Sequence, residues 1–261
     1  MKGETTFVVK TLNRLAIVTG TSKGIGHALA VELLNRGWNV VGLARGKQPS
    51  DLKNPLYIHH RLDVGDLETL NMWCRSYLGD QQLSEHDRIG LVNNAAFLEP
   101  VGPTTSLASQ ELSNQMAVNF IAPTYMTGFV LEHSPTQTPI TVINLSSGAA
   151  TKAQPGWTGY CASKAALRIA GEVLAAEVQT YPELLKRKLS VVTYAPNVVD
   201  TQMQEDLRAM EKTRFPDKQR FVDLNREGIL VPAHGPAIEM SDLLEHDGLP
   251  PYSELRYHPP T

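Results

Sequence analysis

Short apolar runs alternate along the chain with longer stretches in which apolar residues recur at helical spacing. Leu15–Val18 contains no polar position, which is typical of a strand covered on both faces of a parallel sheet. The strand candidates are Leu15–Thr19, Trp38–Ala44, Leu56–Leu62, Ile89–Asn93, Ile140–Leu145, Leu189–Tyr194 and Tyr252–Tyr257. Helices are predicted near Ile25–Arg36, Leu67–Tyr77, Gln110–Glu132, Thr158–Thr180 and Gly235–Glu245. The alternation predicts an α/β fold, a doubly wound and mostly parallel seven-stranded sheet with helices on both faces, in one domain over residues 1–261.

One segment departs from this rhythm. Gln202–Arg226 is rich in charge, contains Pro216 and follows a predicted strand directly. Because open α/β sheets bind ligands beyond the carboxyl ends of their strands, we expect this segment to form a substrate lid. The alternative is a solvated helical excursion without a role in function.

Composition and charge narrow the class of protein. Of the 261 residues, 42% are hydrophobic and 20% are charged, which is the balance of a soluble protein with a full core. The net charge of −3 argues against a nucleic acid or an anionic membrane surface as partner, because binding to either requires an excess of positive charge. The apolar trio Phe7–Val9 is too short for a signal sequence, and the two cysteines, Cys74 and Cys161, are expected to be free thiols in a reducing compartment. We therefore expect a cytoplasmic protein.

A metal centre is not expected. The adjacent His59 and His60 lie on a predicted strand and so point to opposite faces of the sheet. The sequence contains no HxxxH or HExxH spacing.

A glycine-rich loop follows the first predicted strand and opens the first predicted helix. It reads Thr19-Gly20-Thr21-Ser22-Lys23-Gly24-Ile25-Gly26. Such a loop lets the backbone approach a pyrophosphate and aims free helix N–H groups at it. Gly20 is expected to make the tight turn, Gly24 the close approach and Gly26 the packing of helix against strand. The TGxxxGxG spacing resembles that of the short-chain dehydrogenase/reductase family, which implies a Rossmann-type fold.

The end of the second strand bears on the choice of cofactor. Ala44 occupies the position at which NAD enzymes of this family carry an acid, and Arg45 follows it. Lys23 lies within the glycine loop, where NADP enzymes of the family often carry a base. Two cations without an opposing carboxylate favour a 2′-phosphate. The expected cofactor is therefore NADP(H).

Tyr160 and Lys164 form a YxxxK pair at helical spacing, so both side chains lie on one helix face. Proton exchange near neutral pH requires the pKa of the phenol to fall by about two to three units, which a nearby Lys⁺ and a nicotinamide ring can favour. Ser147 lies thirteen residues before Tyr160, the interval of the family's carbonyl-orienting serine, and is preferred over Ser146. Asn119 matches the family's helical asparagine, which supports a water-mediated proton path to the lysine. The resemblance thus implies a catalytic set of Asn119, Ser147, Tyr160 and Lys164.

Further matches complete the expected cofactor cradle. Asp63-Val64 resembles the adenine-contacting pair of the family. Asn93-Asn94-Ala95-Ala96 resembles NNAG, and Pro196–Thr201 resembles PGxxxT with Asn197 in place of the glycine, a residue that tolerates the left-handed conformation. The cofactor-binding residues implied are Gly20, Ser22, Lys23, Gly24, Ile25, Gly26, Arg45, Asp63, Val64, Asn93, Ala95, Tyr160, Lys164, Pro196, Val199 and Thr201.

The resemblance extends to a subgroup of carbonyl reductases. Pro155-Gly156-Trp157 and Val199–Gln204 are similar to segments of sepiapterin reductases and microbial benzil reductases. Arg256 stands near the place where the pterin-anchoring aspartate is expected, so an aromatic or vicinal diketone is the preferred substrate. A pterin reductase, an NADP(H)-binding regulator without activity, and an alcohol dehydrogenase working in the oxidative direction are the alternatives. The two long predicted helices and the small residues of the second imply a homodimer or homotetramer.

Overall fold

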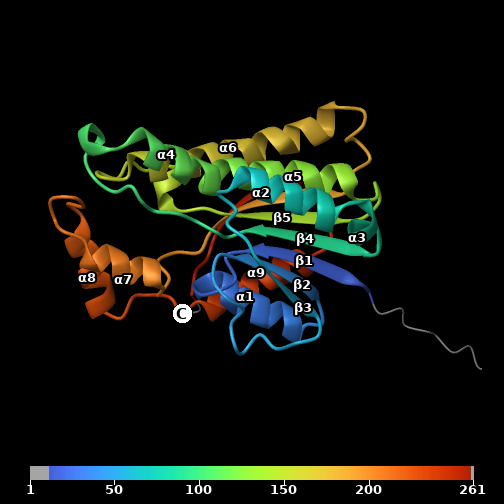
Figure 1. Ribbon diagram of the computed structural model, residues 1–261, viewed down its shortest axis with the longest axis horizontal. Coiled ribbons are helices and arrows are strands. Elements are labelled where there is room, and N and C mark those ends of the chain that lie inside the picture. Colours follow the sequence, from blue (N-terminus) through green and yellow to red (C-terminus); the bar gives the residue numbers. More distant parts are fainter. Residues whose placement is uncertain (1–11, 260–261) are drawn as a thin grey trace, which may run out of the picture.

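A computed structural model describes residues 12–259, and for Asp80 and Gln81 the backbone only. The trio Phe7–Val9 lies outside the described residues. Within them a parallel seven-stranded sheet has the order β3-β2-β1-β4-β5-β6-β7 (Figure 1). The strands are β1 (Arg14–Thr19), β2 (Asn39–Ala44), β3 (Tyr57–Arg61), β4 (Arg88–Asn93), β5 (Ile140–Leu145), β6 (Leu189–Ala195) and β7 (Tyr252–Arg256). The predicted doubly wound sheet is confirmed.

Helices cover both faces of the sheet (Figure 1). One face carries α2 (Leu67–Trp73), α3 (Asp80–Ser84), α4 (Ser109–Met116), α5 (Ala122–His133) and α6 (Thr158–Thr180), and the other carries α1 (Gly24–Asn35) and α9 (His234–Glu245). Strand residues of alternating orientation therefore enter two separate cores. Leu15 and Ile17 pack on the α5 side, whereas Ala16 and Val18 pack on the α1 side. Burial on both faces explains why these strands lack polar positions.

The helix predicted over Gln110–Glu132 is interrupted. It consists of α4, a π-helical turn η3 (Ala117–Ile121) and α5. The backbone N–H of Ala122 donates to the carbonyl of Ala117, five residues earlier, which is the bond of a π-turn. A second π-turn, η1 (Cys74–Leu78), continues α2 in the same way.

The carboxyl ends of the strands meet at one edge of the sheet. The strand order reverses beside β1, because β2 lies on one side of it and β4 on the other. Ligand sites of open α/β folds form at such a switch point. Four short helical elements follow strands at this edge. They are the 3₁₀ turns η2 (Thr104–Ser106) and η4 (Gly148–Ala150), and the two helices of the lid candidate, α7 (Gln202–Ala209) and α8 (Lys218–Arg226). No helix between residues 12 and 259 is long and apolar enough to cross a membrane.

Candidate active site

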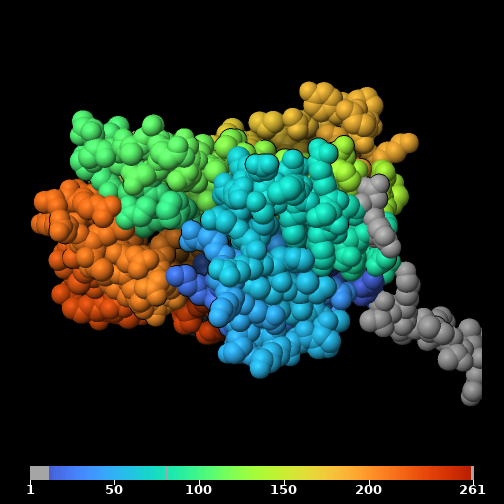
Figure 2. Space-filling model, viewed as in Figure 1, coloured from blue at the N-terminus to red at the C-terminus, as the bar shows by residue number. Residues whose placement is uncertain are grey.

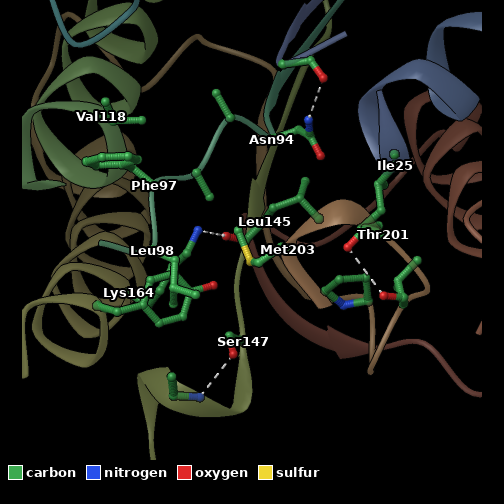
Figure 3. Close-up of a pocket in the computed structure, with 18 of the residues that line it drawn as sticks. Ile25, Asn94, Phe97, Leu98, Val118, Leu145, Ser147, Lys164, Thr201 and Met203 are labelled. Atoms are coloured by element: carbon green, nitrogen blue, oxygen red, sulfur yellow. Dashed lines mark hydrogen bonds between the residues drawn. The ribbon is translucent and has the colours of Figure 1, made fainter. Parts of the chain in front are cut away.

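A cleft of about 1070 Å³ opens along the carboxyl edge of the sheet. In Figure 2 the surface is hollowed where the segment of α7 and α8, in orange, meets the glycine loop, in blue. The cleft wall contains all of the predicted site residues except three: Gly26, Asn93 and Asn119. Figure 3 shows residues of the nucleotide end, such as Ile25 and Thr201, together with Ser147 and Lys164 around the same space.

The glycine loop has the geometry that the sequence predicts. Gly20 and Gly24 have φ values of 78° and 61°, a region that favours glycine. A β-carbon on Gly26 would lie 2.4 Å from the carbonyl oxygen of Gly20. Gly26 is thus required for the packing of α1 against the loop and does not line the cleft, whereas Gly20 and Gly24 do.

The amino-terminal end of α1 is suited to a phosphate. The N-cap residue Lys23 makes no side-chain hydrogen bond to the first turn, and that turn contains no acidic residue. Its N–H groups and the positive end of the helix dipole lie at the cleft, beside the backbone of the glycine loop. The residues present therefore fit the diphosphate of a dinucleotide.

The cations predicted to bind a 2′-phosphate are not free of acidic neighbours. Arg45 Nη1 lies 3.9 Å from the carboxylate of Asp63, and both side chains are exposed. The prediction that no carboxylate lies opposite the cations Lys23 and Arg45 is therefore wrong at Arg45. At this distance and exposure the attraction is weak, so the guanidinium keeps its capacity to bind a second anion. Lys23 also lines the cleft.

Tyr160 and Lys164 lie side by side on α6, both buried at the cleft wall. The Nζ of Lys164 donates a hydrogen bond of 2.7 Å to the carbonyl of Leu145 at the end of β5 (Figure 3). It lies 5.8 Å from the centre of the Tyr160 ring. One N–H of the ammonium is thus used to fix its position, and the others are left for a ligand.

Ser147 is the second residue after β5 and the N-cap of the η4 turn. Its Oγ accepts a hydrogen bond from the N–H of Ala149, which fixes the side chain, and hydrogen bonding by its hydroxyl favours the ionised form of Tyr160. The neighbouring Ser146 donates its backbone N–H to the Tyr194 carbonyl and so continues the sheet. Both serines line the cleft, and the choice of Ser147 over Ser146 stays a prediction.

The pKa of the Tyr160 phenol shifts in the direction opposite to the one predicted. Burial raises it to about 12, and the hydrogen bond with Ser147 only partly opposes this effect. Burial also lowers the pKa of Lys164 to about 8. The protein's own groups therefore keep Tyr160 in its protonated form at neutral pH, and the lowering expected from Lys164 together with a nicotinamide ring stays a prediction. A protonated phenol is the form needed by a proton donor.

Asn119 lies in the π-turn η3 and is completely buried. Its Oδ1 accepts a hydrogen bond from the N–H of Phe97, and its Nδ2 donates to the Phe97 carbonyl and to Ser163 Oγ. The side chain therefore holds the Phe97 loop against α6 and does not reach the cleft. Asn119 is a positioning residue in this arrangement, and its part in a proton path stays a prediction.

The structure places Asn94 at the cleft in place of Asn93. Asn93 is the last residue of β4 and donates to Asn144 Oδ1 on the neighbouring strand β5. Asn94 Nδ2 instead donates to the Thr19 carbonyl and so holds the glycine loop (Figure 3). At Asn197 the sequence prediction is confirmed, because this residue has the left-handed φ of 67°.

The end of the cleft beyond Tyr160 combines an aromatic cluster with charged side chains, those of Lys152, Asp217, Arg220 and Arg256. Trp157 stacks on Phe215 with a ring separation of 5.2 Å and 3° between planes, and it meets the Tyr160 ring edge-on at 5.3 Å. Phe221 of α8 packs on both Trp157 and Phe215. This cluster attaches the lid candidate to the helix of Tyr160. Of its members the sequence pointed only to Trp157 and Tyr160, because the contacts with Phe215 and Phe221 join segments far apart in the chain.

Residues 14–212 match the model of the short chain dehydrogenase family. This region contains the glycine loop, Ser147, Tyr160 and Lys164. The chain belongs to the short-chain dehydrogenase family. Enzymes of this family are oxidoreductases that use a nicotinamide cofactor, and the residues of the cleft fit such a group.

The dehydrogenase is similar to proteins of known activity. It is 30% identical over 251 residues to a benzil reductase ((S)-benzoin forming) of Bacillus cereus, covering 93% of this chain and 98% of the relative. Identity to the sepiapterin reductase of Mus musculus is also 30%, over 89% of this chain and 92% of the relative. The crystal structure of the KRED1-Pglu enzyme has a TM-score of 0.77 and 26% identity, covering 92% of this chain and all of that one.

Proposed function

We propose that this dehydrogenase is an NADPH-dependent carbonyl reductase whose preferred substrates are aromatic or vicinal dicarbonyl compounds. The observation that carries the proposal is the convergence of Ser147, Tyr160 and Lys164 on one cleft wall, next to the glycine loop. Similarity to benzil reductases over nearly the full length supports the substrate class.

Each side chain has a defined part in the proposed reaction. A bound reduced nicotinamide supplies hydride to the carbonyl carbon. The hydroxyl of Ser147 donates a hydrogen bond to the carbonyl oxygen, and Tyr160 delivers its proton to that oxygen as negative charge develops there. The ammonium of Lys164 then stabilises the phenolate electrostatically from 5.8 Å, the distance to the ring centre.

The character of the substrate end favours diketones over pterins. A diketone of low polarity is held by burial against Trp157 and Phe221, at roughly 25 cal/mol per Å² removed from water. A pterin brings several hydrogen-bond donors that need acceptors. Three acids near the carboxyl terminus are engaged elsewhere in ion pairs: Asp242 and Glu245 with Arg36, and Asp247 with Arg88. Asp217 is the acid that lines the described part of the substrate end, and it already accepts from Gln154 at 2.7 Å.

The substrate proposal is tested by NADPH consumption across a carbonyl panel of benzil, phenylpropanedione, sepiapterin and simple aldehydes. We expect kcat/KM for the diketones to exceed that for sepiapterin by at least tenfold under saturating NADPH. A preference for sepiapterin would assign the cleft to pterins, with Asp217 as the anchor to examine by Asp217→Asn. No turnover with any carbonyl would leave an inactive NADP(H) binder as the better description.

The cofactor proposal rests on Lys23 and Arg45. We expect NADPH to bind at least tenfold more tightly than NADH, a difference of about 1.4 kcal/mol. Arg45→Ala should remove most of this difference, while Asp63→Asn should widen it because the carboxylate 3.9 Å away is neutralised. Equal dissociation constants for the two cofactors in the wild type, measured by calorimetry, would contradict the assignment.

A further inference from the structure

Arg256 is the last residue of β7 and lines the cleft beside the reacting groups. Its backbone is fixed, because Arg256 pairs with Ala195 of β6 and the following N–H, of Tyr257, donates to the Ala195 carbonyl. Tyr257 is buried. The guanidinium therefore extends from a backbone position that is fixed by pairing with β6.

The guanidinium lies over the residue that follows Ser147. The Nη2 of Arg256 is 3.8 Å from the position that a β-carbon on Gly148 would occupy. No ion pair or side-chain hydrogen bond joins Arg256 to another residue in the described part of the chain, unlike Arg168 on the adjacent helix, which is paired with Glu172 and Glu254. Arg256 thus presents an unpaired, planar cation to the cleft, beside the residue that follows Ser147.

The surroundings increase the attraction for an anion. Lys152 and Arg220 also line the substrate end of the cleft, so that with Arg256 three cations there outnumber the carboxylate of Asp217. A cleft wall with an excess of one sign of charge raises the local concentration of oppositely charged substrates. Of these cations Arg256 is the one whose guanidinium lies beside Gly148, the residue that follows Ser147.

We propose that Arg256 is a specificity-determining residue that binds the carboxylate of an aryl α-keto acid while Ser147 and Tyr160 bind its keto oxygen. The proposal rests on the proposed carbonyl reductase activity and deepens it. An α-keto acid is a vicinal dicarbonyl in which the second group is anionic, and a guanidinium binds a carboxylate through two parallel hydrogen bonds. The aryl group then lies against Trp157 and Phe221. Hydride adds to the keto carbon and the Tyr160 proton to its oxygen, giving a 2-hydroxy acid and NADP⁺, with the carboxylate unchanged.

The test compares benzoylformate with its methyl ester, which have the same aryl ketone and differ in charge. Because the ester is intrinsically more electrophilic, the quantity of interest is the ratio of kcat/KM for the acid to that for the ester. In Arg256→Met we expect this ratio to fall at least tenfold, mainly through the KM for the acid. Arg256→Lys keeps the charge and should restore part of the loss.

Lys152→Met is the matched control, since it removes one positive charge from the same end of the cleft. An unchanged ratio in Arg256→Met would overturn the proposal. An equal fall in both variants would also overturn it, because the effect would then belong to net charge and not to a contact. If the wild type reduces the ester but Arg256 has no effect, only this inference fails. If neither compound nor any diketone is reduced, the proposed function fails.

Discussion

At the scale of single residues, the site combines groups whose burial is unfavourable for folding. Lys164 is buried, its Nζ is bonded among the described residues to one backbone carbonyl, and burial lowers its pKa to about 8 from 10.5. Near neutral pH the unfolded chain therefore binds this proton more readily than the folded protein. Each pKa unit corresponds to about 1.4 kcal/mol, so keeping the lysine charged costs on the order of 3 kcal/mol of stability.

Lys164→Met should accordingly stabilise the cofactor-free protein while abolishing activity. We expect a gain of about 2 kcal/mol at pH 7, after subtraction of roughly 1 kcal/mol for the lost hydrogen bond to Leu145. The gain should shrink as the pH rises from about 8 toward 10.5, since the folded and then the unfolded lysine lose their protons. Urea unfolding at pH 7 and pH 10 measures both values. A variant less stable than the wild type at pH 7 would contradict this assignment of the burial cost.

At the scale of elements, the lid candidate is attached by an aromatic cluster that lies apart from the two main cores. Phe215, between α7 and α8, is completely buried and stacks on Trp157. A second attachment joins Arg214 to Glu99 at 2.8 Å. Because the attachment depends on few residues, we expect residues 202–226 to loosen independently of the rest of the protein.

Phe215→Ala tests this independence. Removing a buried phenylalanine costs about 3–5 kcal/mol, and the loss should fall on the lid segment. We expect the substrate KM to rise several-fold, NADPH affinity to be retained, and limited proteolysis to cleave within residues 202–226. The matched control is Phe129→Ala, because Phe129 lies on α5 and packs into the main core on that side of the sheet. This variant should lower global stability without directing cleavage to residues 202–226. Cleavage at the same sites in both variants would show that the segment is not a separate unit.

The elements could be predicted from the sequence much more closely than the contacts between them. The limits of β5 and α6 agree with prediction, because apolar runs and helical periodicity are local signals. The π-turns are not predicted, because each spans five residues, too few for the shift of about 100° per inserted residue to stand out from the apolar pattern of the neighbouring turns. Asn94 lines the cleft instead of the predicted Asn93 because the Asn93 side chain points toward β5. The stacking of Phe215 on Trp157 depends on the path of the chain between α7 and α8. Both are tertiary properties.

At the scale of the whole molecule, an exposed apolar face points to self-association. On α6 the residues that face outward are small or apolar, and Ile169 and Val173 are each about half exposed, at 50% and 49%. The others at the same helical spacing are Ala162, Ala165 and Ala176. Such a face on a long helix can pack against its copy across a two-fold axis.

We therefore predict a homodimer, or a tetramer built from it, through this face. Light scattering should give at least twice the chain mass of 28.7 kDa at micromolar concentration. Ile169→Asp should lower the measured mass by placing a charge in the interface, whereas Ile238→Asp, on the opposite side of the sheet in α9, should leave it unchanged. A wild-type mass of one chain would refute the prediction.

In the proposed reaction the phenol of Tyr160, at the wall of the cleft, donates the proton to the carbonyl oxygen. Tyr160→Phe removes only the hydroxyl and leaves the ring contacts with Trp157 and Lys164 in place. The most direct measurement is therefore turnover of NADPH with a diketone by wild type and Tyr160→Phe, alongside NADPH binding by calorimetry. We predict that kcat falls by at least about 10²-fold, the usual range for loss of a general acid, while the dissociation constant for NADPH stays within a factor of about two. Substantial turnover by Tyr160→Phe would contradict the account, because another group would then have to deliver the proton.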